Sequence, residues 1–258
     1  MIDLTGRVVI LTGASSPVGQ ATARQLVDAG ATVVLAYHRR IEVIERLLKE
    51  LEPLKGLGMP YAVNVASRGS VDAMVGEALR EFGRIDALVH NAHGPIERHP
   101  FLQRTWDDYE GQFDVLVRGG FNCCQAVLDE MVLRRQGRIL FVLNNLVTRP
   151  VTGYNPFTTA IAALQGLARD LANEVGELGI QVNTLSPGFT LTGETPHAPP
   201  RVQESLAGQT PLRRLAQPED IAQAALFFVS DLSGFVTGEN LNVDGGYTFG
   251  YGGAPIGE

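Results

Sequence analysis

The sequence of 258 residues contains very little lysine. Lys49 and Lys55 are its two lysines, and the other side chains counted as basic are arginines. Chemistry that depends on a lysine ammonium is therefore excluded from everything after residue 55. Cysteine is equally scarce. Cys123 and Cys124 are adjacent, which argues against a disulfide framework and supplies no spaced metal ligands. We expect them to be small core residues of a helix, and we expect no metal site.

Long hydrophobic runs and a strong positive charge are also missing. No run of 18 uncharged apolar residues occurs, so no transmembrane helix is expected. The N-terminus, MIDLTGRVVILTG, lacks the regions of a signal peptide, which makes a cytoplasmic protein the expectation. A net charge of -7 gives no support for nucleic-acid binding. The hydrophobic content of 45% fits one large domain with a full core, without a membrane partner.

Short apolar runs alternate with longer amphipathic segments along the chain. The runs predict about seven strands, over residues 7–13, 31–37, 59–65, 86–92, 137–143, 180–186 and 239–245. The amphipathic segments predict helices over residues 18–29, 41–51, 70–82, 104–134, 156–177 and 218–230. This alternation indicates an α/β fold, a single Rossmann-type doubly wound parallel sheet flanked by helices, over residues 1–258.

Two segments fall outside the alternation. Residues 189–210 are proline-rich and precede the last helix, so they form either a mobile surface loop or a substrate lid at the carboxyl ends of the strands. Residues 247–258 form a glycine-rich tail, which is extended, packed on a neighbouring subunit or disordered.

The first predicted strand leads into TGASSPVG, residues 12–19, and then into a helix. A glycine-rich turn at a helix N-terminus exposes backbone N–H groups and the positive end of the helix dipole, which suits a pyrophosphate. Pro17 lacks an N–H and fixes its φ angle, so this turn has one donor fewer than a turn built on glycine. We expect nucleotide binding to be weakened at this position without being lost.

Several segments together resemble the short-chain dehydrogenase/reductase family, in particular members similar to 3-oxoacyl-acyl-carrier-protein reductases. TGASSPVG resembles the family's TGxxxGxG turn, and HNAH, residues 90–93, resembles its NNAG motif. VNTLSPGFTLT, PLRRLAQPEDIA and FVTGENLNVDGG resemble later blocks in the family's order. The resemblance implies a Rossmann-type domain, an oligomer that is usually a tetramer, and NAD or NADP as the cofactor.

The resemblance also implies which residues would hold the nucleotide. They are Gly13, Ser15, Ser16, Val18, Gly19, Arg39, Asn64, Val65, Asn91, Pro187, Gly188 and Thr192. No carboxylate follows the second strand, where one would bond a ribose hydroxyl and repel a 2′-phosphate. Arg39 and Arg40 stand there instead and favour NADP(H), unless they are a solvated helix cap. His93 replaces the last glycine of NNAG and adds bulk near the nicotinamide ribose, which is a second reason to expect nucleotide binding to be weakened or lost.

The four catalytic positions of the family are all changed in this sequence. The family uses a relay asparagine, a serine, a tyrosine and a lysine. Ala162-Ala163-Leu164 and the interval to Pro187-Gly188 align these positions with Leu116, Asn144, Phe157 and Ile161. No other register restores the lysine, because none follows Lys55. Phe157 and Ile161 lie four residues apart on one helix face and, with Leu116, would fill the pocket with hydrocarbon.

Three other groups remain candidates for proton transfer or oxyanion binding. Tyr154 lies seven residues before Ile161, which resembles the spacing of related enoyl reductases, but it is also placed to be a structural tyrosine at a helix start. Asn144 or Asn145 would bond an oxyanion or cap a strand end. His93 would serve as an acid or base, or would be an inert loop histidine.

Two classes of function follow from this pattern. The first is a catalytically silent structural or regulatory subunit, either a homo-tetramer or a hetero-oligomer with an active paralogue. The second is an enzyme with altered chemistry. It would be an NADPH-dependent reductase of an activated enoyl or an iminium, or a non-redox enzyme acting in an apolar pocket.

Overall fold

Seven parallel strands form one sheet in the computed structural model, which describes residues 2–192 and 198–250. The strands are β1 (Val8–Thr12), β2 (Thr32–Tyr37), β3 (Leu57–Ala62), β4 (Ala87–His90), β5 (Gly137–Val142), β6 (Ile180–Pro187) and β7 (Asn240–Val243). Their order across the sheet is β3-β2-β1-β4-β5-β6-β7, and every neighbouring pair is parallel. The order reverses between β1 and β4, which is where ligands bind in folds of this type. The predicted doubly wound sheet and its seven strands are confirmed.

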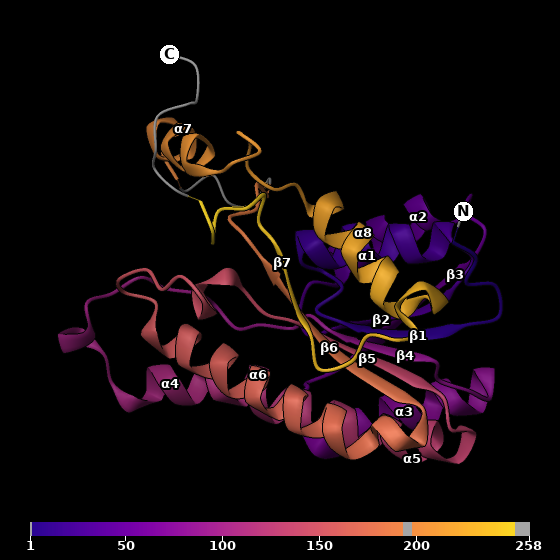
Figure 1. Ribbon diagram of the computed structural model, residues 1–258. Helices are drawn as coiled ribbons and strands as arrows, with labels where there is room; N and C mark the ends of the chain where they lie inside the picture. Colours follow the sequence, from indigo (N-terminus) through magenta and orange to yellow (C-terminus); the bar gives the residue numbers. More distant parts are fainter. Residues whose placement is uncertain (1, 193–197, 251–258) are drawn as a thin grey trace.

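Helices cover both faces of the sheet (Figure 1). They are α1 (Pro17–Asp28), α2 (Ile41–Leu51), α3 (Arg68–Phe82), α4 (Trp106–Phe113), α5 (Gly119–Arg134), α6 (Asn155–Val175), α7 (Pro200–Gln209) and α8 (Pro218–Val229). Short 3-10 segments are η1 (Phe101–Gln103), η3 (Asn145–Val147), η4 (Gly176–Leu178) and η5 (Asp231–Ser233). In the described part of the chain, no helix is both long and apolar enough to cross a membrane.

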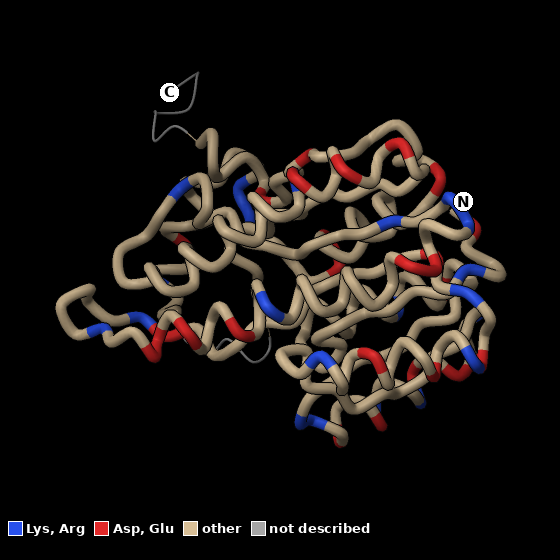
Figure 2. Tube along the Cα trace, turned by 90° about the horizontal axis from the view of Figure 1, so that it is seen from below, with Lys and Arg blue, Asp and Glu red and all other residues tan. Residues whose placement is uncertain are grey.

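Two apolar layers hold the helices against the sheet. One contains residues of α1, α2 and α8, such as Leu26, Ile44 and Phe228. The other contains residues of α3, α5 and α6, and includes Cys123 and Cys124. Both cysteines are buried, as expected, and burial raises the pKa of the Cys123 thiol to about 12. Acidic and basic residues are interspersed along the helices and the segments between them (Figure 2).

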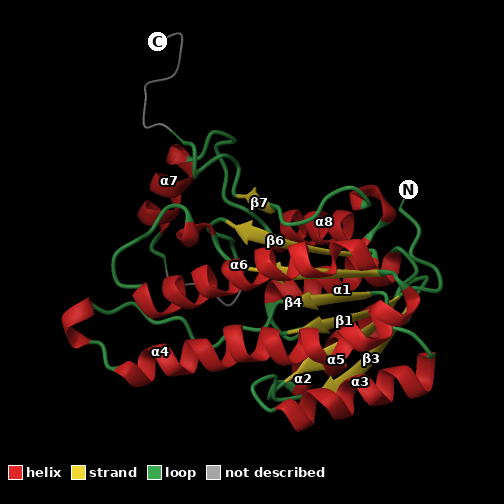
Figure 3. Cartoon of the chain, turned by 60° about the horizontal axis from the view of Figure 1, so that its bottom comes forward, coloured by secondary structure: helices red, strands yellow, loops and turns green. Residues whose placement is uncertain are grey.

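The long helix predicted over residues 104–134 is interrupted. A π-helical turn, η2 (Asp114–Arg118), separates α4 from α5. α4 begins one residue after Thr105, whose backbone N–H donates to the Asp108 carboxylate at 2.8 Å. The sequence pattern did not reveal the extra residue of the π-turn, because apolar residues continue through it at nearly helical spacing. α4 and the loop before it extend beyond the carboxyl ends of the strands (Figures 1 and 3).

The segment predicted as a loop or lid, residues 189–210, contains a helix. α7 begins at Pro200, and proline at the first helical position is favoured because its missing N–H would have no intrahelical partner. Residues 193–197 of the segment lie outside the described residues, as do residues 251–258 of the tail. α7 stands at the end of the sheet to which the strand arrows point (Figure 3). α7 therefore lies at the carboxyl ends of the strands, where ligands bind in open α/β sheets (Figure 3).

Candidate active site

The candidate site lies where the strands end at their carboxyl edge. Because all seven strands are parallel, the residues that follow β1, β4, β5 and β6 emerge at one edge of the sheet (Figure 3). These segments carry the turn at residues 13–19, the HNAH motif, the two asparagines after β5 and the Pro-Gly pair. The topology thus brings together motifs that are far apart in the sequence.

The turn between β1 and α1 has the compact geometry of a phosphate cradle. Gly13 has φ +66°, a left-handed conformation that glycine adopts without strain. A Cβ atom at Gly19 would lie 2.2 Å from the Gly13 carbonyl oxygen, so no larger residue fits the first turn of α1. Pro17 occupies the first position of this helix, where proline is well tolerated. The helix therefore starts regularly despite the change from the family pattern.

Asn91 fastens this turn to the end of β4. Its side-chain amide donates to the Gly13 carbonyl and to Ser16 Oγ, both at 3.1 Å. Ser16 Oγ also accepts from the Gly19 N–H at 3.1 Å and so caps α1. A hydroxyl oxygen has two lone pairs, and these two bonds occupy both. The Ser16 hydroxyl proton is left to donate, at the positive end of a helix.

The other residues expected to contact a nucleotide line the same edge. Val18, Ser15, Thr192 and Arg39 are partly or fully exposed, whereas Val65 and the pair Pro187 and Gly188 are buried. A Cβ atom at Gly188 would lie 2.6 Å from the Cβ atom of Asp244, the residue after β7, so this close approach requires glycine. The Asn64 carboxamide oxygen accepts from its neighbour Ala66 N–H at 3.1 Å, and the residue is exposed.

Three of the four positions that the sequence resemblance predicts to be substituted lie together among apolar side chains. Leu116 on the π-turn and Phe157 and Ile161 on α6 belong to one buried cluster, with exposures of 1%, 5% and 0%. The fourth, Asn144, uses its side-chain oxygen to accept from the Leu146 N–H at 3.0 Å, so it caps the 3-10 turn after β5. Asn145 is buried and donates to the Asp244 carboxylate at 3.2 Å. The amide of Asn145 is thus bonded to Asp244, whereas the printed hydrogen bond of Asn144 involves its side-chain oxygen and not its amide N–H groups.

The two remaining candidates differ in their surroundings. Tyr154 precedes the first residue of α6 and is half-buried, with the Arg98 guanidinium 5.9 Å from the centre of its ring. The loop around it is tied down, because the Gly153 carbonyl accepts from Arg104 at 3.0 Å and from the His99 N–H at 3.1 Å. His93 is exposed, and its Nδ1 lies 3.0 Å from the Gly94 carbonyl oxygen.

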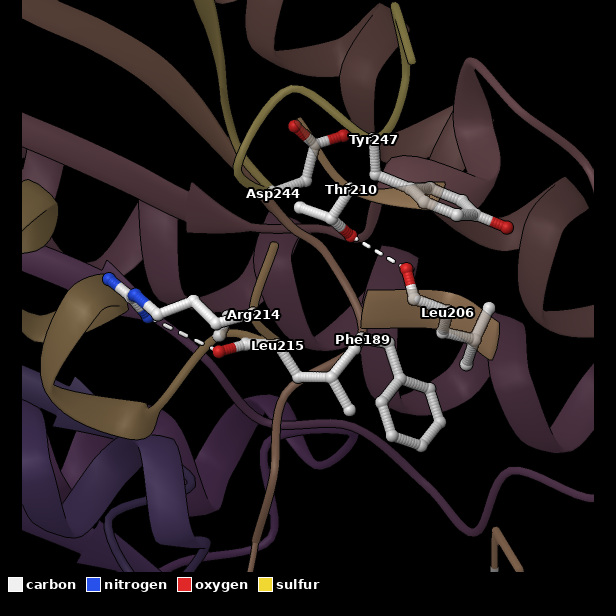
Figure 4. Close-up of a pocket in the computed structure, with 8 residues that line it drawn as sticks. Phe189, Leu206, Thr210, Arg214, Leu215, Asp244 and Tyr247 are labelled. Carbon is white, nitrogen blue, oxygen red and sulfur yellow. Dashed lines mark hydrogen bonds between the residues drawn. The ribbon is translucent and has the colours of Figure 1, made fainter. Parts of the chain in front are cut away.

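A small hollow beside the site was not anticipated from the sequence. It has a cavity volume of about 10 Å³ and lies between α7 and the ends of β6 and β7 (Figure 4). Its lining comprises Phe189, Leu206, Thr210, Arg214, Leu215, Ala216, Asp244 and Tyr247. Burial alone would raise the pKa of Asp244, but hydrogen bonds from Thr248, Asn145 and the Gly246 N–H hold it below its usual value. The sequence identifies the VDGG segment only by its resemblance to the family, and in the structure its Asp244 carboxylate is a buried hydrogen-bond acceptor.

Sequence reasoning also missed two buried polar residues under the cradle. Thr12 and His90 are 0% and 1% exposed, and Thr12 Oγ1 lies 3.1 Å from His90 Nδ1. The signal was present in the HNAH motif, whose first residue is histidine where the family motif begins with asparagine. Among the described residues, no group of three histidine, cysteine or acidic side chains is arranged to hold a metal ion.

Comparison with known proteins gives a consistent result. The family model described as enoyl-(acyl carrier protein) reductase matches residues 13–248. The chain is 34% identical over 244 residues to the 3-oxoacyl-[acyl-carrier-protein] reductase FabG of Thermotoga maritima, covering 94% of this chain and 98% of that protein. It is 34% identical over 249 residues to the (2S)-[(R)-hydroxy(phenyl)methyl]succinyl-CoA dehydrogenase subunit BbsD of Thauera aromatica, covering 95% and 98%.

Solved structures agree with these relatives. A 7α-hydroxysteroid dehydrogenase complexed with NADH and 7-oxo glycochenodeoxycholic acid superposes with a TM-score of 0.89 at 30% identity, covering 95% of each chain. A short-chain type dehydrogenase/reductase from Mycobacterium ulcerans superposes with a TM-score of 0.91 at 26% identity, covering 97% of this chain and 93% of that one.

The prediction of a catalytically silent structural subunit is therefore wrong. The relatives are named as reductases and dehydrogenases, and nothing in the comparisons indicates a silent member. Missing proton-transfer groups remove only one contribution to the rate, so their absence does not by itself imply a silent protein. Orientation of hydride donor and acceptor supplies a large share by itself. The fold, the cradle and the relatives together show that this chain belongs to the short-chain dehydrogenase/reductase family.

Proposed function

We propose that the protein is an NADP(H)-dependent oxidoreductase whose hydride transfer does not use the family's tyrosine and lysine. The observation that carries the proposal is the cradle between β1 and α1. Its Ser16 hydroxyl has both lone pairs occupied by protein N–H groups and keeps its proton for an acceptor oxygen. A donor of this kind at a helix N-terminus suits a phosphate.

The residues present fit a nicotinamide nucleotide. Gly13, Ser16 and Gly19 would hold its pyrophosphate, and Asn91 fixes their relative positions. The buried Pro187 and Gly188 close the same edge of the sheet at the end of β6. When bound, the nicotinamide ring supplies or accepts the hydride. The enzyme's own contribution is to bind and orient the cofactor and to exclude water with the hydrocarbon of Leu116 and Phe157.

NADP(H) is favoured over NAD(H) by the residues after β2. Tyr37 ends the strand, and His38 and Arg39 follow without any carboxylate. Arg39 is exposed at the carboxyl edge of the sheet, and a guanidinium pairs with a phosphate through two parallel hydrogen bonds. A carboxylate at this point would repel the 2′-phosphate.

The apolar interior of the site selects for substrates that need little proton assistance. Phe157 and Ile161 provide no donor where the family has tyrosine and lysine. An iminium carbon accepts hydride to give a neutral amine, so it requires no proton. An activated enoyl group forms an enolate, which then needs one proton, and the half-buried Tyr154 hydroxyl is the candidate donor. We therefore propose iminium or activated enoyl substrates.

Nucleotide binding is the first test of this proposal. Titration of the protein with NADPH, followed by its fluorescence, is expected to give saturable binding that is tighter than for NADH. Arg39→Ala should weaken NADPH binding about tenfold, or about 1.4 kcal/mol, and leave NADH binding unchanged. Arg24→Ala, at an exposed arginine of α1 paired with Glu50, is the matched control. Absence of NADPH binding by the wild-type protein would overturn the proposal.

Turnover is the second test. NADPH oxidation should be measured with a cyclic iminium, an enoyl thioester and a 3-oxoacyl thioester. Consumption with either of the first two supports the proposed substrate class, and Tyr154→Phe should slow only the enoyl reaction. Binding of NADPH without oxidation by any substrate in a broad panel of these classes would contradict the proposed activity.

A further inference from the structure

The Thr12 hydroxyl is the centre of a buried hydrogen-bond cluster below the cradle. Thr12 ends β1 and is completely buried. Its oxygen accepts from the backbone N–H groups of Asn91 and Ala92, both at 3.1 Å. These two bonds occupy both lone pairs, so the hydroxyl takes part in any further bond only as the donor. The remaining neighbour within hydrogen-bond distance is His90 Nδ1, at 3.1 Å.

The tautomer of His90 follows from this count of donors and acceptors. Since Thr12 must donate, His90 Nδ1 must accept, and the proton of the neutral ring lies on Nε2. Burial lowers the pKa of His90 to about 4, and the nearby carbonyls of Leu116 and Val115 offset only part of this effect. The ring is therefore neutral at pH 7. Nε2 faces the π-turn without a well-formed hydrogen bond to any described residue.

The other end of the cluster reaches the nucleotide cradle. Asn91, whose N–H is fixed by Thr12, donates from its side chain to the Gly13 carbonyl and to Ser16 Oγ. Ser16 is the helix cap whose oxygen accepts two N–H groups, so its hydroxyl proton remains to donate. A continuous set of hydrogen bonds thus runs from the His90 ring through Thr12 and Asn91 to Ser16.

We infer that His90 is a positioning residue for the cofactor: as its Nε2–H tautomer it fixes the Thr12 hydroxyl and thereby holds Asn91 and the Ser16 donor in place. The inference rests on the proposed binding of a nicotinamide nucleotide at the cradle. Without the histidine acceptor, the Thr12 hydroxyl has no acceptor for its proton and must rotate. Rotation moves its lone pairs away from the N–H groups of Asn91 and Ala92 and loosens the cradle.

Replacement of His90 tests the role directly. His90→Phe retains a ring and removes the acceptor, and it is expected to raise the dissociation constant of NADPH about tenfold. His90→Asn supplies a carboxamide oxygen as acceptor and should restore most of the affinity. Thr12→Val breaks the same bond from the other side and keeps the test valid should His90→Phe fail to fold. The double variant that combines His90→Phe with Thr12→Val should bind NADPH no more weakly than the weaker-binding single variant. Both substitutions remove the same hydrogen bond, so their effects should not add. His99→Phe, at an exposed histidine, should leave the affinity unchanged.

A spectroscopic measurement distinguishes positioning from simple packing. Nitrogen-15 NMR at pH 7, with the His90 ring assigned as the signal that His90→Asn removes, should show this ring as an Nε2–H tautomer with an unprotonated Nδ1. An Nδ1–H tautomer would overturn the inference. So would His90→Phe and Thr12→Val variants that fold and bind NADPH as tightly as the wild type. Wild-type protein that binds no NADPH would instead overturn the proposed function, so the two failures are distinguishable.

Discussion

At the scale of the residue, the hydrogen bonds of single hydroxyl groups decide which of them can bind a ligand. Ser16 and Thr12 each have a hydroxyl oxygen that accepts two hydrogen bonds, but their hydroxyl protons differ in whether the protein offers an acceptor. The Thr12 proton is consumed inside the protein by His90, whereas the Ser16 proton has no acceptor among the hydrogen bonds of the described residues. Hydrogen-bond counting therefore separates a structural hydroxyl from a ligand-binding one without reference to the ligand.

Restoring the family lysine is expected to harm the protein at this scale. Ile161 is completely buried among apolar side chains that include Leu116 and Phe157. Ile161→Lys would place an ammonium there without a partner, and we expect it to lower the free energy of unfolding by about 3–5 kcal/mol. Urea denaturation measures this. Ile161→Met, which roughly conserves volume, should cost less than about 1.5 kcal/mol. An equal, small loss for both variants would show that the site admits water.

The turn from β1 into α1 shows how an element is built to hold a ligand. Gly13 supplies a left-handed residue, Ser16 caps the helix and Pro17 begins it in a conformation that suits a first turn. Gly19 then passes so close to the Gly13 carbonyl that no side chain fits. The same segment that starts the helix therefore shapes the cradle.

A substitution in this turn should affect binding and stability together. Gly19→Ala places its Cβ atom 2.2 Å from the Gly13 carbonyl oxygen, so the turn must open. We expect NADPH affinity to fall at least about tenfold, since the donors of the cradle separate. Gly166→Ala is the matched control on α6, where nothing lies within 4 Å of the new atom. It should stabilise the protein by about 1 kcal/mol and leave the affinity unchanged. Unchanged affinity for Gly19→Ala would place the nucleotide elsewhere.

An ion cluster at the opposite edge of the sheet joins elements across the whole molecule. Asp86, before β4, is buried and accepts from the Val8 N–H of β1 at 2.8 Å and from Arg84 Nε at 2.8 Å. Arg134 of α5 and Arg7 also reach this carboxylate, at 3.2 and 3.5 Å. Burial alone would raise the pKa of Asp86, but these hydrogen bonds and charges hold it below its usual value. The cluster fixes the start of β1 against β4 and α5.

Removing that charge should destabilise the whole fold. Asp86→Asn leaves the half-buried guanidinium groups of Arg7, Arg84 and Arg134 without their anion and is expected to cost about 2–3 kcal/mol in the free energy of unfolding. Because the folded-state pKa of Asp86 is depressed, its contribution is complete above the unfolded value of about 3.9 and is lost as the pH falls through the folded value. The deficit of Asp86→Asn should therefore shrink below about pH 4. Urea denaturation at several pH values measures this deficit in the free energy of unfolding. The control is Asp72→Asn, which removes an exposed ion pair with Arg68 and should lower the free energy of unfolding by less than about 1 kcal/mol. A deficit that does not depend on pH would contradict this assignment.

Exposed apolar side chains near α4 bear on how the whole molecule assembles. Large apolar side chains are exposed on and before α4, where Phe101, Leu102 and Trp106 have exposures of 64%, 96% and 72%. We propose a homo-oligomer, as the resemblance to the family implies. Light scattering on the purified protein tests this directly.

The sequence alone determined the alternation of strands and helices, the parallel sheet and the place of the cradle. These features depend on local periodicity and on glycine and proline at turns, which neighbouring residues encode. It also established the absence of the catalytic lysine, because no lysine exists after Lys55 in any register. The sequence did not determine what the missing lysine means for activity. The prediction of a catalytically silent protein was wrong.

Only the tertiary structure decided which polar groups have hydrogen-bond partners within the protein and which remain available to a ligand. Asn144 proved to be a cap and Asn145 an anchor for Asp244. The hydrogen bond between His90 and Thr12 likewise joins two residues that lie 78 positions apart in the sequence. Spacing along a chain does not record such contacts, because they are formed only when β1 and β4 pair side by side.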